Sequence, residues 1–458
     1  MSSLGRLVFP EGVFSEVKAH LLRGHKEEVA LIFGHVVQRG APSIVVARWM
    51  PVPPDALLVH RDDRFEMDSG FLVRHVKMAR SRGESVVVAH SHPGDLEHPE
   101  FSIPDARGEA DLYPFLLTRL PNRPHGAMVV SPGGASARLT TGFPGEFAVP
   151  VEIRVIGRHM LRVLPRGHAG WQAHTDPYHA RQELIWGSHG QGLLRGATVG
   201  VVGAGGTGSV VVQQLIHLGV GRIIVIDPQV VTDSNLSRIV GARRSDAGRT
   251  RKVDVVARLG AEVDPEVMVQ PIADTVCRQD VARTLLEADL IFLCTDSHYS
   301  RAVVNALALQ YLIPVVDLGF RIEMNSAGDR VASATGEVRI VIPGGYCLSC
   351  AQVVDAERIL AEKATPKERA AFPGYFSNLD VPDPSVITVN SLIASLAVSV
   401  GLDVLVPTMH AVSPFDRYRF NVLKGIVSDV SQPRDASCSI CGPDGLVGLA
   451  DDHPFPCP

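Results

Sequence analysis

The stretch "ATVGVVGAGGTGSVVVQQLIHLGVGRIIVID", residues 197–227, places a glycine-rich turn between two apolar runs. The first run ends at the turn, a segment of helical character follows, and the second run ends in an aspartate. A strand, a helix and a strand in this order form a βαβ unit, which implies a parallel sheet. Further apolar runs follow in "ADLIFLCTD", "IPVVDLGF" and "EVRIVIPG". The sequence therefore predicts an α/β fold with a mainly parallel, Rossmann-like sheet here.

The first part of the chain has a different texture. Short β-rich runs such as "EEVALIFGHVV", "SVVVAHSH" and "GAMVVS" alternate with helical stretches, which predicts a small α/β domain. A chain of 458 residues is too long for one core. We expect one domain at 1–145, a linker at 146–174, a second domain at 175–445 and a flexible tail at 446–458.

Bulk composition excludes several classes of protein. The formal net charge is −5, so a general nucleic-acid binder with a basic face is not expected. No window reaches about 18 uninterrupted apolar residues, and the N-terminus does not resemble a signal peptide. We expect a soluble, cytoplasmic protein without a membrane segment. In a reducing compartment, cysteine pairs are metal ligands rather than disulfides.

The glycine-rich turn contains Gly203, Gly205, Gly206 and Gly208. Such a turn lets backbone N–H groups approach phosphates at a helix N-terminus. Asp227 ends the next strand, where an acidic residue would bind a ribose hydroxyl. A nicotinamide- or flavin-binding dehydrogenase matches the same fingerprint, so the turn alone favours a dinucleotide.

The residues that follow favour ATP. Asn235, Arg238 and Lys252 come shortly after the second strand, and Asp296 stands at the end of another. Cations in this position suit a triphosphate and the charge that develops when an adenylate forms. The alternative for Arg238 and Lys252 is a solvated helix face.

A histidine-rich stretch, "VVVAHSHPGDLEHPEFSIPD", occupies residues 86–105. His90 and His92 project to the same side of a strand, close enough to share one ion. Catalytic zinc usually has three protein ligands and a water, and Asp105 could be the third ligand. The alternative is that Ser102 and Asp105 form only a helix cap.

Two Cys-x-x-Cys pairs are the second sign of metal. Cys347 and Cys350 form one pair, and Cys438 and Cys441 form the other. Four thiolates complete a closed, tetrahedral, structural zinc site. A chance occurrence or a redox pair is the alternative.

The arrangement of "EEVALIFG", "HSHP" and Ser-x-x-Asp over residues 5–145 resembles the JAMM (JAB1/MPN/Mov34) zinc metalloproteases, which release ubiquitin-like proteins from amines. The resemblance implies that His90, His92 and Asp105 hold zinc and that Ser102 stabilises the tetrahedral intermediate. It implies that Glu27 deprotonates the zinc-bound water, with Glu28 as the alternative. The segment between "HSHP" and Ser102 is two residues longer than in the commoner pattern.

The second half, together with "YHARQELIWGSHGQGLLRG" before it, resembles the E1-like family that includes ThiF and MoeB. This implies that Arg181 reaches into the site of a partner subunit, which requires a homodimer. It also implies a structural zinc on the four cysteines and a site for ATP and magnesium formed by Asp227, Asn235, Arg238, Lys252 and Asp296.

The E1 pattern is broken at one place. Enzymes of this family that form a thioester carry a nucleophilic cysteine between the zinc pairs, and this chain has none there. Its remaining thiols are Cys277, Cys294 and Cys457, of which Cys294 lies in an apolar strand. Either the reaction stops at the acyl-adenylate, or an unusual residue such as Cys277 or Cys457 accepts the acyl group.

Together the resemblances imply a fusion that acts on a ubiquitin-like protein. One domain would trim its C-terminus or release its conjugates, and the other would adenylate the exposed carboxylate. A bacterial conjugation pathway, such as an antiphage system with an E2-like partner, is one setting. The alternatives are sulfur-carrier activation for thiocarboxylate chemistry and a non-catalytic scaffold that binds ubiquitin-like folds.

Overall fold

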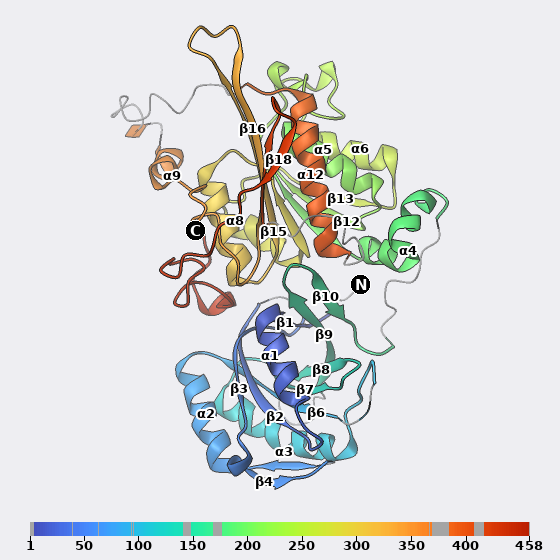
Figure 1. The fold of residues 1–458 in the computed structure, drawn as a ribbon, viewed down its shortest axis with the longest axis vertical. Coiled ribbons are helices and arrows are strands. Elements are labelled where there is room, and N and C mark those ends of the chain that lie inside the picture. Colours follow the sequence, from blue (N-terminus) through green and yellow to red (C-terminus); the bar gives the residue numbers. More distant parts are fainter. Residues whose placement is uncertain are drawn as a thin grey trace. The chain divides into compact units, whose positions relative to one another are not determined.

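The chain forms two units, each built on its own sheet (Figure 1). The first consists of Met1–Gly170, Gln310–Leu312 and Leu446–Pro454, and the second of Trp171–Leu309, Ile313–Gly445 and Phe455–Pro458. The structure is a computed structural model, and it describes residues 4–38, 40–62, 64–92, 94, 96–140, 148–167, 176–365, 367–368, 384–406 and 416–457.

The first unit is an eight-stranded sheet in the order β1-β3-β2-β6-β7-β8-β9-β10. A further parallel pairing of β1 with β9 closes the sheet on itself. The strands are β1 (Arg6–Pro10), β2 (Val29–Val36), β3 (Ser43–Pro51), β6 (Ser85–Ser91), β7 (His125–Val130), β8 (Ala135–Thr140), β9 (Val149–Ile156) and β10 (Met160–Val163). A separate hairpin pairs β4 (Leu57–His60) with β5 (Phe65–Met67).

The helices of this unit cover opposite faces of β2 and β6. Helix α1 (Glu11–Leu21) packs on the face that carries Ala30 and Ile32. Helices α2 (Ser69–Ser81) and α3 (Ile103–Arg119) pack on the other face, with Val29 and Leu31. Because side chains alternate along a strand, each face of β2 has its own apolar cluster.

Two of the expected boundaries are wrong. The segment expected as a linker contains β9 and β10, whose residues Val151, Ile153 and Val155 alternate into the core of the first unit. The tail expected to be flexible is packed, because Asp452 Oδ2 lies 2.8 Å from Nδ1 of the buried His35. Residues 141–147 and 168–175 lie outside the described residues.

The second unit has a sheet in the order β13-β12-β11-β14-β15-β16-β17-β18. The first five strands are parallel, and β16, β17 and β18 continue antiparallel from β15. They are β11 (Thr198–Val202), β12 (Arg222–Ile226), β13 (Met268–Ile272), β14 (Leu290–Leu293), β15 (Val315–Met324), β16 (Val331–Val341), β17 (Arg417–Asn421) and β18 (Ile426–Asp429). The expected βαβ unit and mainly parallel sheet are confirmed, with α5 (Gly206–His217) joining β11 to β12.

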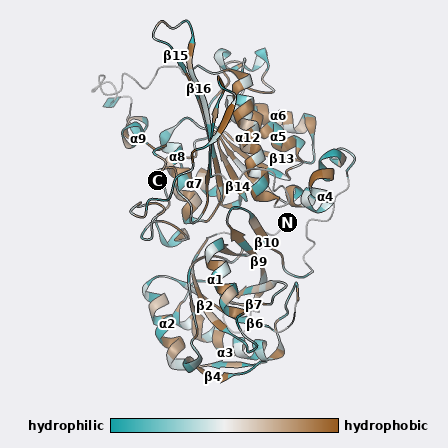
Figure 2. Ribbon diagram, in the orientation of Figure 1, coloured by the Kyte–Doolittle hydropathy of each residue, from teal (hydrophilic) through white to brown (hydrophobic). Residues whose placement is uncertain are grey.

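Helix α12 (Ile387–Leu405) is a long, apolar helix of this unit, labelled in Figure 2. By length and composition it could cross a membrane, with a mean hydropathy of 1.7. It packs against α5, β15 and β16, and Ile393 approaches Gly336 closely. These contacts are those of a core helix that covers one face of the sheet.

The other helices of this unit are α4 (Ala180–Arg195), α6 (Lys252–Val263), α7 (Gln279–Ala282), α8 (His298–Gln310) and α9 (Ala356–Lys363). Strand β11 lies between β12 and β14, so the chain turns in opposite directions after β11 and β14. Ligands of open α/β sheets bind at such a switch point, beyond the carboxyl ends of the strands. The glycine-rich turn and Asp296 both lie at this edge.

Candidate functional site

The end of β6 and the start of α3 bring the three expected metal ligands of the first unit together. His90 Nε2 lies 3.1 Å from His92 Nε2 and 3.1 Å from Asp105 Oδ1. The other carboxylate oxygen lies 3.2 Å from His92 Nε2. Ligand atoms at zinc–nitrogen and zinc–oxygen bond lengths of ~2.0 Å stand about 3.3 Å apart in a tetrahedron. The three residues therefore fit one face of a tetrahedral zinc site.

Asp105 is also the third residue of a helix cap. Its Oδ2 accepts hydrogen bonds from the backbone N–H of Ser102 at 2.6 Å and from the Ser102 hydroxyl at 2.8 Å. Burial raises the pKa of this carboxyl, but hydrogen bonds from His90 and His92 outweigh it and hold the pKa well below its usual range. Asp105 can therefore act both as a cap residue and as a metal ligand, because the cap holds its carboxylate next to His90 and His92.

The register of β2 against β6 places the expected general base. Val29 pairs with His90 in the antiparallel ladder. The ladder ends at this pair, and extending its register by two residues sets Glu27 against His92. Opposed residues of an antiparallel pair share a face of the sheet. Glu27, which is 7% exposed, therefore lies on the same face as both histidines.

Glu28 occupies the other face. Its carbonyl accepts a hydrogen bond from the N–H of Ser91 at 3.1 Å, and its Oε2 lies 2.8 Å from Arg23 Nη2 in an ion pair. The carboxylate is thus engaged on the side away from the histidines. The geometry favours Glu27 over Glu28 as the base.

The four cysteines of the second unit converge. Cys347 Sγ lies 3.8 Å from Cys350 Sγ and 3.7 Å from Cys438 Sγ, and Cys350 Sγ lies 3.3 Å from Cys441 Sγ. Four sulfurs at zinc–sulfur bond lengths of ~2.3 Å stand about 3.8 Å apart in a tetrahedron. A disulfide needs a distance of ~2.05 Å, so all four thiols are free to bind one ion. The cluster fits a closed structural zinc site.

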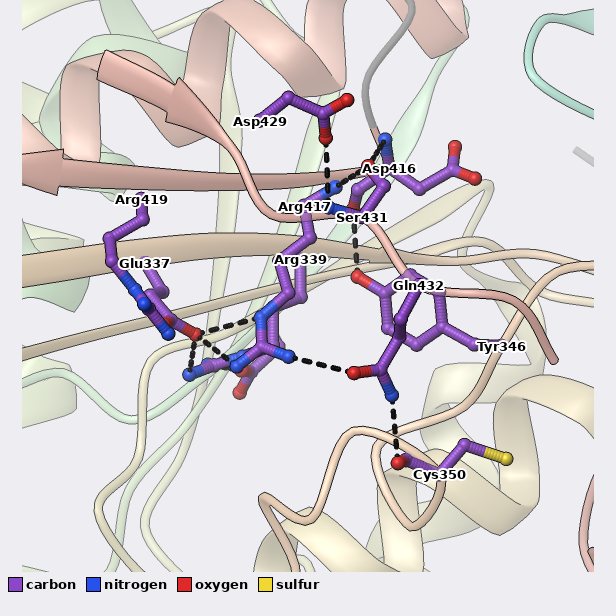
Figure 3. A network of polar contacts seen from close by, with 11 residues as sticks. Glu337, Arg339, Tyr346, Cys350, Asp416, Arg417, Arg419, Asp429, Ser431 and Gln432 are labelled. Carbon is purple, nitrogen blue, oxygen red and sulfur yellow. Dashed lines mark hydrogen bonds and ion pairs between the residues drawn. The ribbon is translucent and has the colours of Figure 1, made fainter. Parts of the chain in front are cut away.

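A charged network adjoins this cluster (Figure 3). Gln432 Nε2 donates to the carbonyl of Cys350 at 2.8 Å, and Gln432 Oε1 accepts from Arg417 Nη1 at 3.2 Å. Arg417 also pairs with Glu337 at 2.8 Å. Burial raises the pKa of Glu337, but Arg339 and the neighbouring arginines lower it overall. The network ties β16 and β17 to the backbone of Cys350, in the way that hydrogen-bond partners commonly support metal ligands.

The glycine-rich turn has the form that a phosphate needs. Gly203 has φ +98°, and the N–H of Ala204 donates to Asp227 Oδ2 at 2.8 Å. A Cβ at Gly208 would stand 1.8 Å from the carbonyl oxygen of Gly203, so only glycine allows α5 this close to the strand end. A Cβ at Gly205 would meet nothing within 4 Å, which leaves the N-terminus of α5 open there.

The expected cations lie around this turn. A Cβ at Gly206 would stand 3.2 Å from Arg238 Cδ, so that side chain passes over the first turn of α5. Lys252 is buried, and its Nζ donates to Gln229 Oε1 at 2.5 Å. The buried Asn235 accepts a hydrogen bond from the N–H of Thr232 and forms part of a local cap, so its side chain shapes the backbone.

Asp296 is exposed in the turn between β14 and α8. The carbonyl oxygen of Cys294, two residues earlier, would stand 2.8 Å from a Cβ on Gly203. The turn that carries Asp296 therefore lies against the glycine-rich turn, and its carboxylate is available to a magnesium ion bound with a nucleotide.

Within one chain, Arg181 does not lie at the glycine-rich turn. It is exposed in the first turn of α4, where the neighbouring Gln182 donates to the carbonyl of Leu218 at 3.3 Å. Leu218 follows the C-terminal end of α5, a helix of 12 residues and thus about 18 Å long. Contribution of Arg181 to the site of a partner subunit stays a prediction.

Comparisons with known proteins agree with this geometry. Residues 179–440, more than half of the chain, match the model of the ThiF family. The chain belongs to the ThiF family. Residues 10–137 match the model of prokaryotic homologs of the JAB domain. The fusion expected from the sequence is thereby confirmed.

Relatives of known name match the ThiF-family half. The SAMP-activating enzyme E1 of Haloferax volcanii is 30% identical over 164 residues, which cover 36% of this chain and 56% of that protein. The sulfur carrier protein adenylyltransferase of Thermus thermophilus is 34% identical over 142 residues, 31% of this chain and 52% of that protein. The chain spans about half the length of these relatives. The crystal structure of E. coli MccB matches with a TM-score of 0.46 and 22% identity, over 60% of this chain and 75% of that chain.

The free thiols of the ThiF-family chain outside the cysteine cluster are not activated. Burial raises the pKa of Cys294 far above its usual range. Burial also raises the pKa of Cys277, and it raises the pKa of Cys457 to about 11. A thiol reacts as its thiolate, so these environments oppose nucleophilic attack.

One side chain at the ThiF-type site was not singled out in the sequence. Glu362 of α9 accepts hydrogen bonds from Ser297 and from the N–H groups at the start of α8. Glu362 lies 65 residues from Ser297 in the sequence, in a charged helix that contains no recognisable motif, so its role could not be predicted from local spacing.

We expect two zinc ions per chain, measured by elemental analysis of the purified protein. His92→Ala should reduce the content to one, because the histidine–aspartate face would lose a ligand while the cysteine cluster stays complete. Cys438→Ser should also leave one zinc and lower the melting temperature, since a closed structural site contributes folding energy. A wild-type content below one zinc per chain would contradict both assignments.

Proposed function

We propose that this protein processes and activates a ubiquitin-like protein. The first unit would hydrolyse the bond at its C-terminus, by trimming an extension or releasing a conjugate, and the ThiF-family half would adenylate the carboxylate so exposed. The supporting observation is that each unit gathers reactive groups of the expected kind: a three-ligand metal face with Glu27 on the same side of the sheet, and a glycine-rich turn near Arg238 and Asp296.

The proposed hydrolysis assigns distinct tasks to the residues of the first unit. Zinc, when bound by His90, His92 and Asp105, lowers the pKa of its water to about 7 and polarises a carbonyl. Glu27 would accept the proton of that water and then deliver it to the leaving amine. The Ser102 hydroxyl, held beside Asp105, would donate a hydrogen bond to the developing oxyanion.

The proposed adenylation begins with attack of a C-terminal carboxylate oxygen on the α-phosphorus of ATP. A new phosphorus–oxygen bond forms, the bond to the β-phosphate breaks, and pyrophosphate leaves. Backbone N–H groups at the start of α5 would bind the phosphates. Arg238 and Lys252 would stabilise the negative charge of the transition state, and Asp296 would hold magnesium, which neutralises the departing pyrophosphate.

The identity of the carrier and the partners is part of the proposal. The name of a relative from Arabidopsis thaliana, ubiquitin-like modifier-activating enzyme 5, supports a ubiquitin-like modifier, and in a conjugation pathway an E2-like protein would receive it. We further propose a homodimer, in which Arg181 completes the partner's site, and a cytoplasmic location. A bacterial antiphage conjugation pathway is one setting that this activity would serve. Capturing the bound carrier and determining its C-terminal residues by mass spectrometry tests the substrate class.

A second candidate is activation of a sulfur carrier for thiocarboxylate chemistry. The name of the Thermus relative favours it, and so do the unactivated thiols, since an acyl-adenylate can be passed directly to a sulfur donor. Captured partners separate the two: an E2-like protein supports conjugation, and a sulfurtransferase supports the sulfur carrier.

Replacing Glu27 by Gln should leave two zinc ions bound but lower the cleavage rate of a C-terminally extended ubiquitin-like protein by about 10²–10⁴-fold, because the water loses its base. The matched control is Glu28→Gln, which removes the ion pair with Arg23 on the other face and should keep most of the activity. Cleavage would be followed by mass spectrometry of the product. An inactive Glu28→Gln beside an active Glu27→Gln would show that the register assigned here is wrong.

Carrier-dependent exchange of pyrophosphate into ATP should disappear in Arg238→Ala and in Asp296→Ala, because each loses a charge that the transition state needs. The double variant Cys277→Ala/Cys457→Ala should retain exchange within about twofold, since neither thiol takes part. Denaturing gels should show no thiol-sensitive adduct between protein and carrier. An adduct that vanishes in the Cys457→Ala variant would identify a thioester and contradict the assignment.

A further inference from the structure

The turn after β14 is held by a side chain from a distant helix. Glu362, near the C-terminal end of α9, accepts from the N–H of His298 at 2.8 Å and from the N–H of Tyr299 at 2.9 Å. Its Oε2 also accepts from the Ser297 hydroxyl at 2.6 Å. The N-terminus of a helix leaves its first N–H groups without partners, and a carboxylate is the strongest acceptor for them. Glu362 therefore caps α8 from outside it.

The three residues that Glu362 holds directly follow Asp296. Thr295, which precedes Asp296, is fixed as well, because the Thr295 Oγ1 accepts a hydrogen bond from the N–H of Ser297 at 3.1 Å. Asp296 is thus the exposed tip of a turn whose stem is held by hydrogen bonds. A ligand on such a turn keeps its direction only while the stem keeps its shape.

Helix α9 docks on the same stem by two more contacts. The N–H of Asp355, the cap of α9, donates to His298 Nδ1 at 3.1 Å. Near its C-terminal end, Lys363 Nζ lies 4.9 Å from the centre of the Tyr299 ring. Cys350, the second cysteine of the first Cys-x-x-Cys pair, comes shortly before Asp355 in the chain. One anchored segment therefore runs from the metal cluster to Glu362.

We propose that Glu362 is a positioning residue for Asp296, which it orients toward magnesium-bound ATP by fixing the turn at Ser297–Tyr299. The inference rests on the proposed adenylation, in which Asp296 holds magnesium. Glu362 does not touch the nucleotide in this role. The carboxylate of Glu362 accepts hydrogen bonds from the N-terminus of α8, and Glu362 acts on Asp296 through the backbone between them.

The test measures binding of ATP to the full-length chain by calorimetry at a series of magnesium concentrations. Glu362→Ala should raise the magnesium concentration for half-maximal binding by about tenfold, the order found when partners of metal ligands are removed. Glu362→Asp, which keeps the charge but withdraws it by one methylene, should also raise it. Glu357→Ala removes the same charge from an exposed site in the first turn of α9 and should change nothing.

A double-mutant cycle with Asp296→Ala separates positioning from a general loss of structure. If Glu362 acts through Asp296, its removal should weaken binding by less than twofold once Asp296 is gone, because coupled residues are not additive. Amide hydrogen exchange of residues 295–299 should speed up in Glu362→Ala while the exchange of α5 stays unchanged. Melting temperature and zinc content show whether each variant is folded.

Other outcomes overturn the inference in distinct ways. Full additivity in the cycle would show that Glu362 and Asp296 act independently. Tighter binding of magnesium-bound ATP in Glu362→Ala would show that α9 obstructs the site rather than supports it. A wild-type chain that binds no ATP would refute the proposed adenylation itself, whereas ATP binding that is equal in wild type and Glu362→Ala would refute only the role of Glu362.

Discussion

The alternation of side chains along β-strands is the constraint on which both candidate sites depend. In β2 and β6 it separates the apolar clusters of the two sheet faces, and at the strand ends the same period directs the histidines and Glu27 to one side. A slip of one residue would turn Val29 and Leu31 away from α2 and α3. The register that puts Glu27, the proposed general base, on the side of the two histidines is therefore maintained by core packing, which makes it costly to change.

The same alternation organises the antiparallel part of the second sheet. Gly336, Val338 and Ile340 of β16 are buried, with Gly336 directed toward α12. Glu337 and Arg339 point to the opposite face, where Arg339 also pairs with the fully buried Asp317. Removing one partner from such a network would leave a buried charge uncompensated, which costs more than an exposed ion pair contributes. The network thus supports the cysteine cluster by fixing the strands next to it.

Sequence alone predicted what is encoded locally. The βαβ unit, the glycine-rich turn and the two Cys-x-x-Cys pairs depend on short spacings, and the structure brings these residues together as expected. Glu27 and Glu28 could not be separated, because the choice depends on pairing with a strand about 60 residues away. For the strands in the expected linker, one reason is similar: besides its neighbours β8 and β10, β9 pairs with β1, at the other end of the domain. Glu362 has no sequence signal at all, since only the fold places it at α8.

Burial of the remaining thiols bears on whether a cysteine of this chain accepts the acyl group after the proposed adenylation. A thiol with a pKa of about 11, as burial gives Cys457, is ionised to roughly one part in ten thousand at neutral pH. Burial also raises the pKa values of Cys277 and Cys294, the latter just after the end of β14. A thiolate that attacks an acyl-adenylate gains from a nearby cation or an open helix N-terminus, yet the N-terminus of α8 is already filled by Glu362. In the adenylation proposed above, the burial of these three thiols therefore favours an acyl-adenylate that is consumed by a nucleophile of the partner that receives the carrier.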